Sequence, residues 1–346
     1  MKQGIADRRV RPYGPGAPVA LAASLTAAAL YILAAAEEPV SAFTAFFLSP
    51  FRPNVLANLI EQAAAPCICA LGTALVFRSG DFNLGGEGQA YAGGTLSVLA
   101  LLAVPALPGS AGLAAGLAVG AAAGSLVALP SALSRRNSGA GVLLSTFLVS
   151  QTVVLFLDWA IAGPFRDSSS NLIATPGVAL SHRLPRILPP SWLSFAPLLA
   201  LAAAVFMDRF LRFTRQGMEL SLFGRNPKFA HTMGFRVQAY AFWPLLISGA
   251  LNGLAGALIA LGVNGRAVRG MTGGIGWNGI SIALLAGNDP RWILPAALFF
   301  SWLETGSRQA SILAGIPADV GTVAKALVLL FATARYVARR RGGERT

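Results

Sequence analysis

Charged residues are scarce in this chain. Asp, Glu, Lys and Arg together make up 12% of its 346 residues, whereas soluble domains carry about 25%. Hydrophobic residues make up 55% of the sequence, and its mean hydropathy is +0.62. This balance excludes an ordinary soluble domain and indicates an integral membrane protein.

The residue types that carry most catalysis and nucleotide chemistry are also few. Cys67 and Cys69 lie in an apolar segment without a nearby histidine or acid cluster, which indicates packed thiols rather than a metal site or a disulfide. His182 and His231 fall in predicted loops, so no nucleophile–histidine–acid arrangement is visible. None of the lysines follows a G-x-x-x-x-G pattern, so the chain has no phosphate-binding loop. We therefore expect no enzyme activity, metal or cofactor in this chain.

Positive charge dominates among the few charges present. The formal net charge is +13 and the sequence pI is about 11.1, values that suggest nucleic acid binding in a soluble protein. No DNA- or RNA-binding motif accompanies them. The basic residues fall instead in predicted loops and tails, where they orient membrane helices. The predicted partner of this charge is the lipid bilayer, not nucleic acid.

Apolar segments of about 20 residues, the length of a membrane helix, recur along the chain. An uncleaved first helix follows a basic tail at residues 1–16, and residues 339–346 form a second basic tail. We expect residues 17–338 to form one transmembrane domain. Its nine clear segments are 17–36, 55–78, 89–105, 110–133, 141–163, 192–211, 238–262, 290–306 and 319–338.

Charge decides whether the Gly-rich segment 270–287 also crosses, because its apolar half is short for a full span. If it crosses, both basic tails and most other Lys and Arg residues fall on the cytoplasmic side, as the positive-inside rule favours. The sequence then predicts an all-α polytopic helix bundle with ten crossings, in two inverted five-crossing halves. Each half carries a Gly-rich break at a corresponding position, which is a pointer to a translocation pathway.

The first break carries the motif FNLGGEGQ at residues 82–89. Its glycines let the chain leave helical geometry, and a carboxylate at membrane depth is a functional-site candidate. We expect Asn83, Glu87 and Gln89 to line or support the translocation path. The alternative is a plain polar hairpin with Glu87 in water, and the sequence leaves open whether the Gly-rich segments are re-entrant or simple loops.

The second break carries Trp277 and Asn278, at the entrance to the broken crossing of the second half. An indole can stack on the face of a base or sugar, and an amide can hydrogen-bond its edge. Both residues are candidate solute contacts. An interfacial tryptophan that anchors its helix is the alternative.

The cytoplasmic loop 208–237 holds the sequence GRNPKFAHTMG. Asn226 suits an N-cap, Pro227 the first helical position and Gly234 the helix stop, which predicts a short helix over residues 227–233. Phe229 and Met233 share one face of that helix. This arrangement favours insertion into a groove on a partner. A membrane-surface helix with both side chains in lipid is the alternative.

Small residues recur every four positions in two of the predicted crossings. Segment 110–133 carries Gly112, Gly116, Gly120 and Gly124, and segment 238–262 carries Gly249 and Gly253. Such spacing lets helix backbones approach closely in lipid. We expect tight packing within the chain here.

Four stretches occur in an order that resembles the permease subunits of bacterial ABC importers of the simple-sugar branch. They are FNLGGEGQ, GRNPKFAHTMGF, SGALNGLAGAL at 248–258 and GGIGWNGISIALLAGNDP at 273–290. FNLGGEGQ more specifically resembles nucleoside-type permeases that work with a basic-membrane-protein-like lipoprotein receptor. The resemblance runs over residues 55–331. The family usually shows an aromatic–acid pair where this chain has Trp277 and Asn278.

The resemblance implies a role and a set of partners. The chain would be the inner-membrane permease subunit of an importer for nucleosides or related sugar-containing solutes. The helix over residues 227–233 corresponds to the coupling helix that contacts the ATPase subunit, which binds ATP and Mg. A second permease subunit, the same or different, and an extracytoplasmic substrate-binding lipoprotein complete the assembly.

A secondary transporter driven by an ion gradient is the rival interpretation. Such a carrier needs ionisable or carbonyl ligands near the bilayer midplane, and Glu61, Glu87, Asp158 and Lys325 are possible ones. The capped cytoplasmic helix favours the importer, because a secondary carrier needs no docking site for an ATPase.

Overall fold

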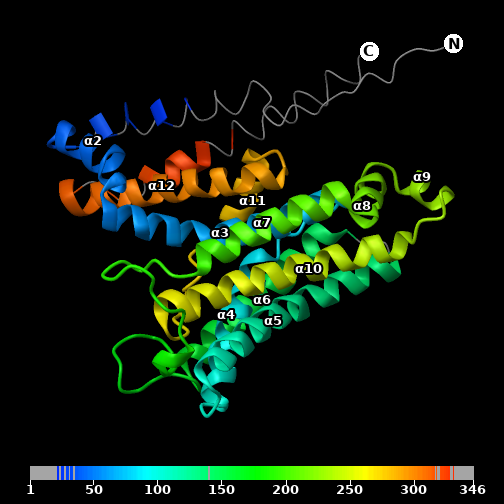
Figure 1. Cartoon of the computed structure of the whole chain (residues 1–346), viewed down its shortest axis with the longest axis horizontal. Helices are drawn as coiled ribbons and strands as arrows, with labels where there is room; N and C mark the ends of the chain where they lie inside the picture. Colours follow the sequence, from blue (N-terminus) through cyan, green and yellow to red (C-terminus); the bar gives the residue numbers. More distant parts are fainter. Residues whose placement is uncertain are drawn as a thin grey trace.

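A computed structural model describes residues 22, 25–26, 29–30, 32–33, 36–138, 141–315, 317, 320–327 and 330 (Figure 1). Within these residues every named element is a helix, and the only β-type pairing is an isolated bridge between Ala174 and Val268. The elements are α2 (Pro39–Phe47), η1 (Ser49–Phe51), α3 (Pro53–Arg78), α4 (Gly86–Ala103), α5 (Gly109–Ser138), α6 (Val142–Ala162), η2 (Leu180–His182), α7 (Ala196–Phe213), α8 (Arg215–Arg225), α9 (Pro227–Thr232), α10 (Val237–Leu258), the π-turn η3 (Ile259–Asn264), α11 (Ile275–Leu285) and α12 (Pro290–Ala314).

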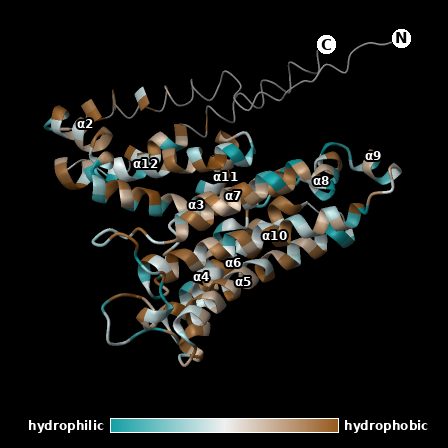
Figure 2. Cartoon of the chain, viewed as in Figure 1, coloured by the Kyte–Doolittle hydropathy of each residue, from teal (hydrophilic) through white to brown (hydrophobic). Residues whose placement is uncertain are grey.

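The bundle has the composition of a multi-pass membrane protein (Figure 2). Four described helices are long and apolar enough to cross a membrane: Pro53–Arg78, Gly109–Ser138, Val142–Ala162 and Val237–Asn264. Helix α11 has 11 residues and a length of about 16 Å, roughly half of the hydrocarbon thickness. The predicted first and last crossings lie mostly outside the described residues, as do both basic tails.

Two helices were not predicted. Helix α2 lies between the first two predicted crossings, and α8 occupies part of what was expected to be a cytoplasmic loop. The Thr214 hydroxyl caps α8 by accepting a hydrogen bond from the Gly217 amide at 3.1 Å, and Leu220 and Phe223 bury its apolar face. A threonine before a segment with two buried apolar positions three apart is a helix-start signal, which makes this local error avoidable.

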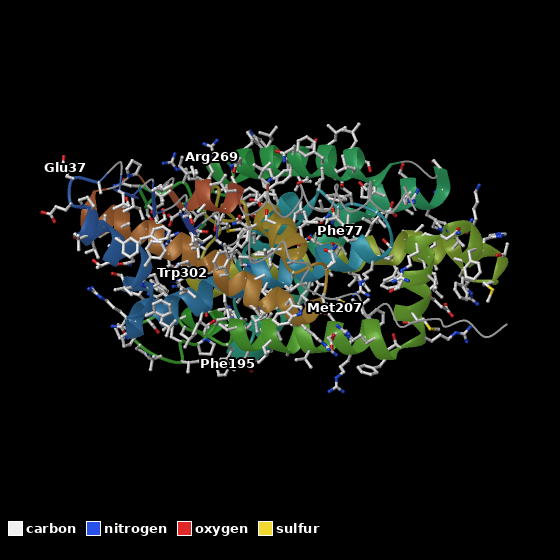
Figure 3. All side chains as sticks on the ribbon, turned by 90° about the horizontal axis from the view of Figure 1, so that it is seen from above. Glu37, Phe77, Phe195, Met207, Arg269 and Trp302 are labelled. Carbon is white, nitrogen blue, oxygen red and sulfur yellow. The ribbon has the colours of Figure 1, made fainter. Side chains whose placement is uncertain are left out.

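One end of the bundle gathers segments that are far apart in the sequence. The C-terminal end of α7 is joined to the start of α12 by ion pairs, with Arg212 2.7 Å from Asp289 and Arg291 3.1 Å from Asp208. The guanidinium of Arg78 donates to the carbonyl of Asn288 at 3.5 Å. Phe77 and Met207, near the ends of α3 and α7, lie toward this end as well (Figure 3).

The opposite end is built from the loop after α6 and the segment before α11. The Thr175 amide donates to Ala267, the Val178 amide to Gly265 and the Arg269 amide to Ile173, at 2.9–3.0 Å. The chain therefore passes from this end at Arg269 to the ion-paired end at Asn288.

Small residues let three helices pack with their backbones in contact. A Cβ atom placed on Gly124 would lie 2.0 Å from the carbonyl oxygen of Gly249, and one on Gly253 would lie 2.1 Å from that of Gly120. On a second face of α10, a Cβ on Gly256 would lie 1.8 Å from the carbonyl oxygen of Ala90. The expected tight packing is confirmed, with α10 as the shared central helix between α5 and α4.

We predict that Gly253→Ala destabilises the protein although alanine has the higher helix propensity, by about 1 kcal/mol. The added methyl group overlaps the Gly120 carbonyl, and overpacking costs about 1–3 kcal/mol. The apparent melting temperature in detergent should fall. Gly141→Ala is the matched control, because no atom lies within 4 Å of its Cβ position. Equal melting temperatures for the two variants would contradict this account of the α5–α10 contact.

Candidate functional site

The first Gly-rich break is shorter than predicted. Helix α4 begins at Gly86, so Glu87, Gly88 and Gln89 lie in its first turn rather than in a loop. Asn83 starts this turn, because its side-chain oxygen accepts a hydrogen bond from the Gly85 amide at 2.8 Å. In this Asx turn, the side-chain oxygen of Asn83 serves as the acceptor that backbone N–H groups at the start of a helix otherwise lack. The non-helical segment is residues 79–85.

Asn83 and Gln89 belong to a buried amide network. The side-chain nitrogen of Asn83 donates to Gln89 and to the Ser248 hydroxyl, both at 3.0 Å, and Asn252 donates to Gln89 at 2.8 Å. Asn83 is 2% exposed and Gln89 1% exposed. These two amides therefore tie the start of α4 to α10. We expected Asn83 and Gln89 to line or to support the translocation path. Because both side chains are buried, they have no open surface with which to line it.

Ser248 and Asn252 were missed as site residues. They lie four apart on α10, within the stretch SGALNGLAGAL that carries part of the family resemblance. Two polar residues on one face of an otherwise apolar crossing are a recognisable signal. Their partners, however, lie more than 160 positions away in the sequence, and no local pattern identifies those partners.

Glu87 caps the N-terminus of α11. Its carboxylate accepts hydrogen bonds from the Thr272 hydroxyl at 2.5 Å, the Gly274 amide at 3.0 Å and the Gly276 amide at 2.9 Å. The first N–H groups of a helix have no partner within the helix, and the positive end of the helix dipole favours an anion there. The polar-hairpin alternative requires this carboxylate to be free in water, and it is not. It joins the first break to the second.

The two breaks meet backbone to backbone. A Cβ atom on Gly276 would lie 2.2 Å from the Glu87 nitrogen, so only glycine fits at that position. We call this contact between the first turns of α4 and α11 the junction. Both helices begin inside the bundle. The irregular backbone before each of them is therefore surrounded by protein rather than lipid.

The depth of the junction follows from its contacts with α6. The Leu84 amide donates to Thr146 at 3.1 Å, and the Gly88 amide donates to Ser150 at 2.8 Å. Ser150 is the ninth residue of the 21-residue helix α6, about 12 Å from its start at 1.5 Å per residue. The junction therefore lies beside the middle of a helix that is long and apolar enough to span a membrane.

Trp277 and Asn278 lie in the first turn of α11, just past the second break. The indole is 41% exposed and makes an edge contact with Phe147 of α6, with ring centroids 6.2 Å apart. Asn278 is half-buried, and its side chain has no hydrogen bond within the described residues. The structure thus brings Trp277 and Asn278 to the same helix end that Glu87 caps.

The predicted cytoplasmic helix is present with its predicted caps. The Asn226 side chain accepts from the Phe229 amide at 3.0 Å, Pro227 takes the first position, and Gly234 has a φ of +76°. The helix ends at Thr232, one residue earlier than expected, and Met233 is its C-cap. Phe229 and Met233 are 47% and 58% exposed, so both are available to a partner.

Helix α8, which directly precedes α9, is anchored to α10. Glu219 of α8 accepts hydrogen bonds from the Tyr240 hydroxyl of α10 at 2.5 Å and from Arg215 at 2.6 Å. These hydrogen bonds, with that from Tyr240 the larger cause, lower the pKa of Glu219. The side chain therefore stays ionised near neutral pH and fixes α8 on α10.

Comparison with known proteins gives consistent matches over most of the chain. Residues 55–333 match the family described as the permease component of a branched-chain amino acid transport system. The chain is 30% identical to a probable riboflavin import permease protein of Treponema pallidum, over 91% of this chain and 85% of that protein. It is 29% identical to a guanosine ABC transporter permease protein of Bacillus subtilis, over 93% of both chains. It is 25% identical to a nucleoside ABC transporter permease protein of Lactococcus lactis, over 89% of this chain and 87% of that protein.

We predict that Glu87 variants lose stability in the order wild type, Glu87→Gln, Glu87→Ala. Alanine leaves Thr272, Gly274 and Gly276 without their acceptor, at about 1–3 kcal/mol for each unsatisfied buried group, whereas glutamine keeps one oxygen. Thermal unfolding in detergent measures the order. Glu38→Gln is the control, since Glu38 is exposed and makes no side-chain cap. If Glu87→Ala unfolds like wild type, the carboxylate does not hold α11.

Proposed function

Because the chain belongs to the family of transport-system permease components just described, we propose that it forms the membrane-spanning pathway of an ATP-driven importer for nucleosides or related sugar-containing solutes. Membership of this family makes it a multi-pass permease subunit rather than an enzyme. We also propose the number of crossings, the residues along the path and the class of solute.

The junction is the observation that carries the proposal. Two helices begin there, near mid-depth, from opposite ends of the bundle: α4 follows a break after Arg78, and α11 follows a break after Arg269. Gly-interrupted helices at corresponding places of two inverted halves are typical of membrane transport sites. The same sidedness supports ten crossings of residues 17–338, with the tails 1–16 and 339–346 in the cytoplasm.

One face beside the junction suits a solute with a ring and polar groups. Glu87, Asn278 and Ser281 are all partly exposed there, and polar groups at mid-depth face water or protein rather than lipid. Trp277 adds an exposed aromatic surface. Guanosine combines a purine with ribose, and riboflavin combines a ring system with a polyol chain. Both chemistries fit an indole beside an amide.

The partners follow from what the chain offers and what it leaves to others. Helix α9 presents Phe229 and Met233 at the ion-paired end of the bundle, where an ATPase subunit would dock and bind ATP and Mg. A substrate-binding lipoprotein would deliver solute at the opposite end, on the outer side of a bacterial inner membrane. A second permease subunit, identical or related, would complete the pathway.

A carrier driven by an ion gradient is less well supported. The four ionisable residues that such a carrier would use already have partners within the chain. These are Glu61 with Ser194 at 2.7–2.8 Å, Glu87 with α11, Asp158 with Tyr91 at 2.6 Å, and Lys325 with Glu304 at 3.1 Å. Removing such partners to bind an ion would leave the polar groups that they satisfy unpaired.

The central test is uptake by the assembled complex in proteoliposomes. We expect guanosine or riboflavin uptake to require ATP and to persist without an ion gradient. Phe229→Ala should abolish it and weaken co-purification of the ATPase about thirtyfold, because a buried aromatic anchor contributes about 2 kcal/mol. Met233→Ala should act in the same direction.

The matched control is Met218→Ala, on the neighbouring helix α8 and 57% exposed, which should leave ATPase binding unchanged. Gly234→Val should also weaken ATPase binding. It meets no atom within 4 Å, so its effect comes only from the left-handed backbone that valine resists. Normal ATPase recovery with Phe229→Ala and Gly234→Val, or gradient-driven uptake without an ATPase, would refute the proposal.

Topology gives an independent prediction. Reporter fusions at Arg8 and Arg345 should both report a cytoplasmic location, because ten crossings return the chain to its starting side. A fusion at Ser169, in the loop after α6, serves as the control for the opposite side. An external signal from either terminus would rule out ten crossings.

A further inference from the structure

Gln151 is a polar side chain near the middle of helix α6. It is the tenth residue of the 21-residue helix α6, half-buried, and its amide makes no hydrogen bond within the described residues. Its neighbour Ser150 accepts a hydrogen bond from the Gly88 amide at 2.8 Å, which fixes Gln151 at the depth of the junction. An amide left unpaired in hydrocarbon costs several kcal/mol. The position of this amide therefore requires water or a polar ligand.

The face of α6 that carries Gln151 also carries Phe147, which contacts Trp277 beside the junction. Phe147 lies one turn before Gln151 on the same side of the helix, and its ring contacts Trp277. Asn278, next to Trp277, is likewise half-buried, and its side chain makes no hydrogen bond within the described residues. Gln151 and Asn278 are thus two amides without a side-chain hydrogen bond, and their neighbours Phe147 and Trp277 form an aromatic contact.

The same side of α6 continues toward the outer end of the bundle. Asp158 lies two turns after Gln151, is half-buried, and pairs with Arg269 at 3.5 Å. An exposed apolar face adjoins Gln151 on its other flank: Leu148 lies one turn before it and Leu155 one turn after it, and these two residues and Trp159 are 54–70% exposed. Gln151 therefore lies where this apolar face meets the side of α6 that carries Phe147 and Asp158.

We propose that Gln151 is a solute-contacting, specificity-determining residue. Its amide would donate to and accept from the polar edge of a heterocycle or the hydroxyls of a sugar, while Trp277 and Phe147 contact the ring face. This inference rests on the proposed function and deepens it by naming a residue of α6 in the pathway. An amide suits a neutral solute, because it offers donors and an acceptor without a charge to desolvate.

Thiol accessibility tests whether Gln151 faces water. In membranes that contain the whole complex, Gln151→Cys should react at least about tenfold faster with a cationic, water-soluble methanethiosulfonate than Thr152→Cys does. Thr152 is the matched control because it lies at the same depth, is exposed, and spends its hydroxyl on the Leu148 carbonyl of its own helix. The native Cys67 and Cys69 are buried, which keeps the background low.

Guanosine and riboflavin should each be tried as protecting agents, and the transported one should slow labelling of Gln151→Cys. Equal labelling rates for the two cysteine variants would overturn the inference. That outcome would place Gln151 in lipid or in a dry contact with the second permease.

Competition among solutes tests the role in specificity. Uptake of labelled guanosine should be measured against unlabelled riboflavin and D-glucose, in wild type, Gln151→Leu and Thr152→Val. A lost hydrogen bond changes relative affinity by up to about tenfold. Gln151→Leu should therefore shift the preference among solutes, whereas Thr152→Val should not.

Different experimental outcomes contradict the proposed function and the role of Gln151. Absence of ATP-dependent uptake of all three solutes by wild type would count against the proposed function, and the labelling comparison would still decide the placement of Gln151. Normal wild-type uptake with an unchanged preference in Gln151→Leu would overturn the role of Gln151 and leave the proposed function intact.

Discussion

Glu87 joins two helices that each begin inside the bundle. Its carboxylate accepts hydrogen bonds from Thr272, Gly274 and Gly276, and so satisfies the exposed N–H groups of α11. A helix that starts at membrane depth needs an acceptor for these groups, since lipid supplies none. The placement of Trp277 and Asn278 depends on this cap, because both residues lie in the turn that it holds.

The cap works only because the helices around it pack without side chains between them. Glycines bring α5 and α4 into backbone contact with α10, and α10 in turn presents Ser248 and Asn252 to Asn83 and Gln89. Close packing and buried polar bonds thus depend on each other here. A wider helix spacing would break the amide network, and an unpaired amide would be costly in the apolar interior. The amides of Gln151 and Asn278, by contrast, are half-buried and make no side-chain hydrogen bond within the described residues.

Features with short-range causes were readable in the sequence. The caps of α9 depend on Asn226, Pro227 and Gly234, which lie within nine positions of one another, and all three adopt the expected roles. Four predicted crossings, 55–78, 110–133, 141–163 and 238–262, coincide with helices long and apolar enough to span a membrane. The errors were local as well: α8 was missed although Thr214 signals its start, and α4 was started at Gln89 because the glycines before it were interpreted as loop. Glycine permits a break without requiring one.

By itself the sequence determined the membrane class, the long apolar segments, the positions of the two breaks and the capped helix α9, because each depends on composition or on residues close together in the chain. Only the tertiary structure decided that the two breaks meet and that Glu87 caps α11. It alone also showed that Asn83 and Gln89 are buried and hydrogen-bonded to each other, and that Phe147, one turn before Gln151, contacts Trp277. These contacts join residues from about 60 to nearly 190 positions apart. Their geometry follows from how the helices pack in three dimensions, which no local pattern records.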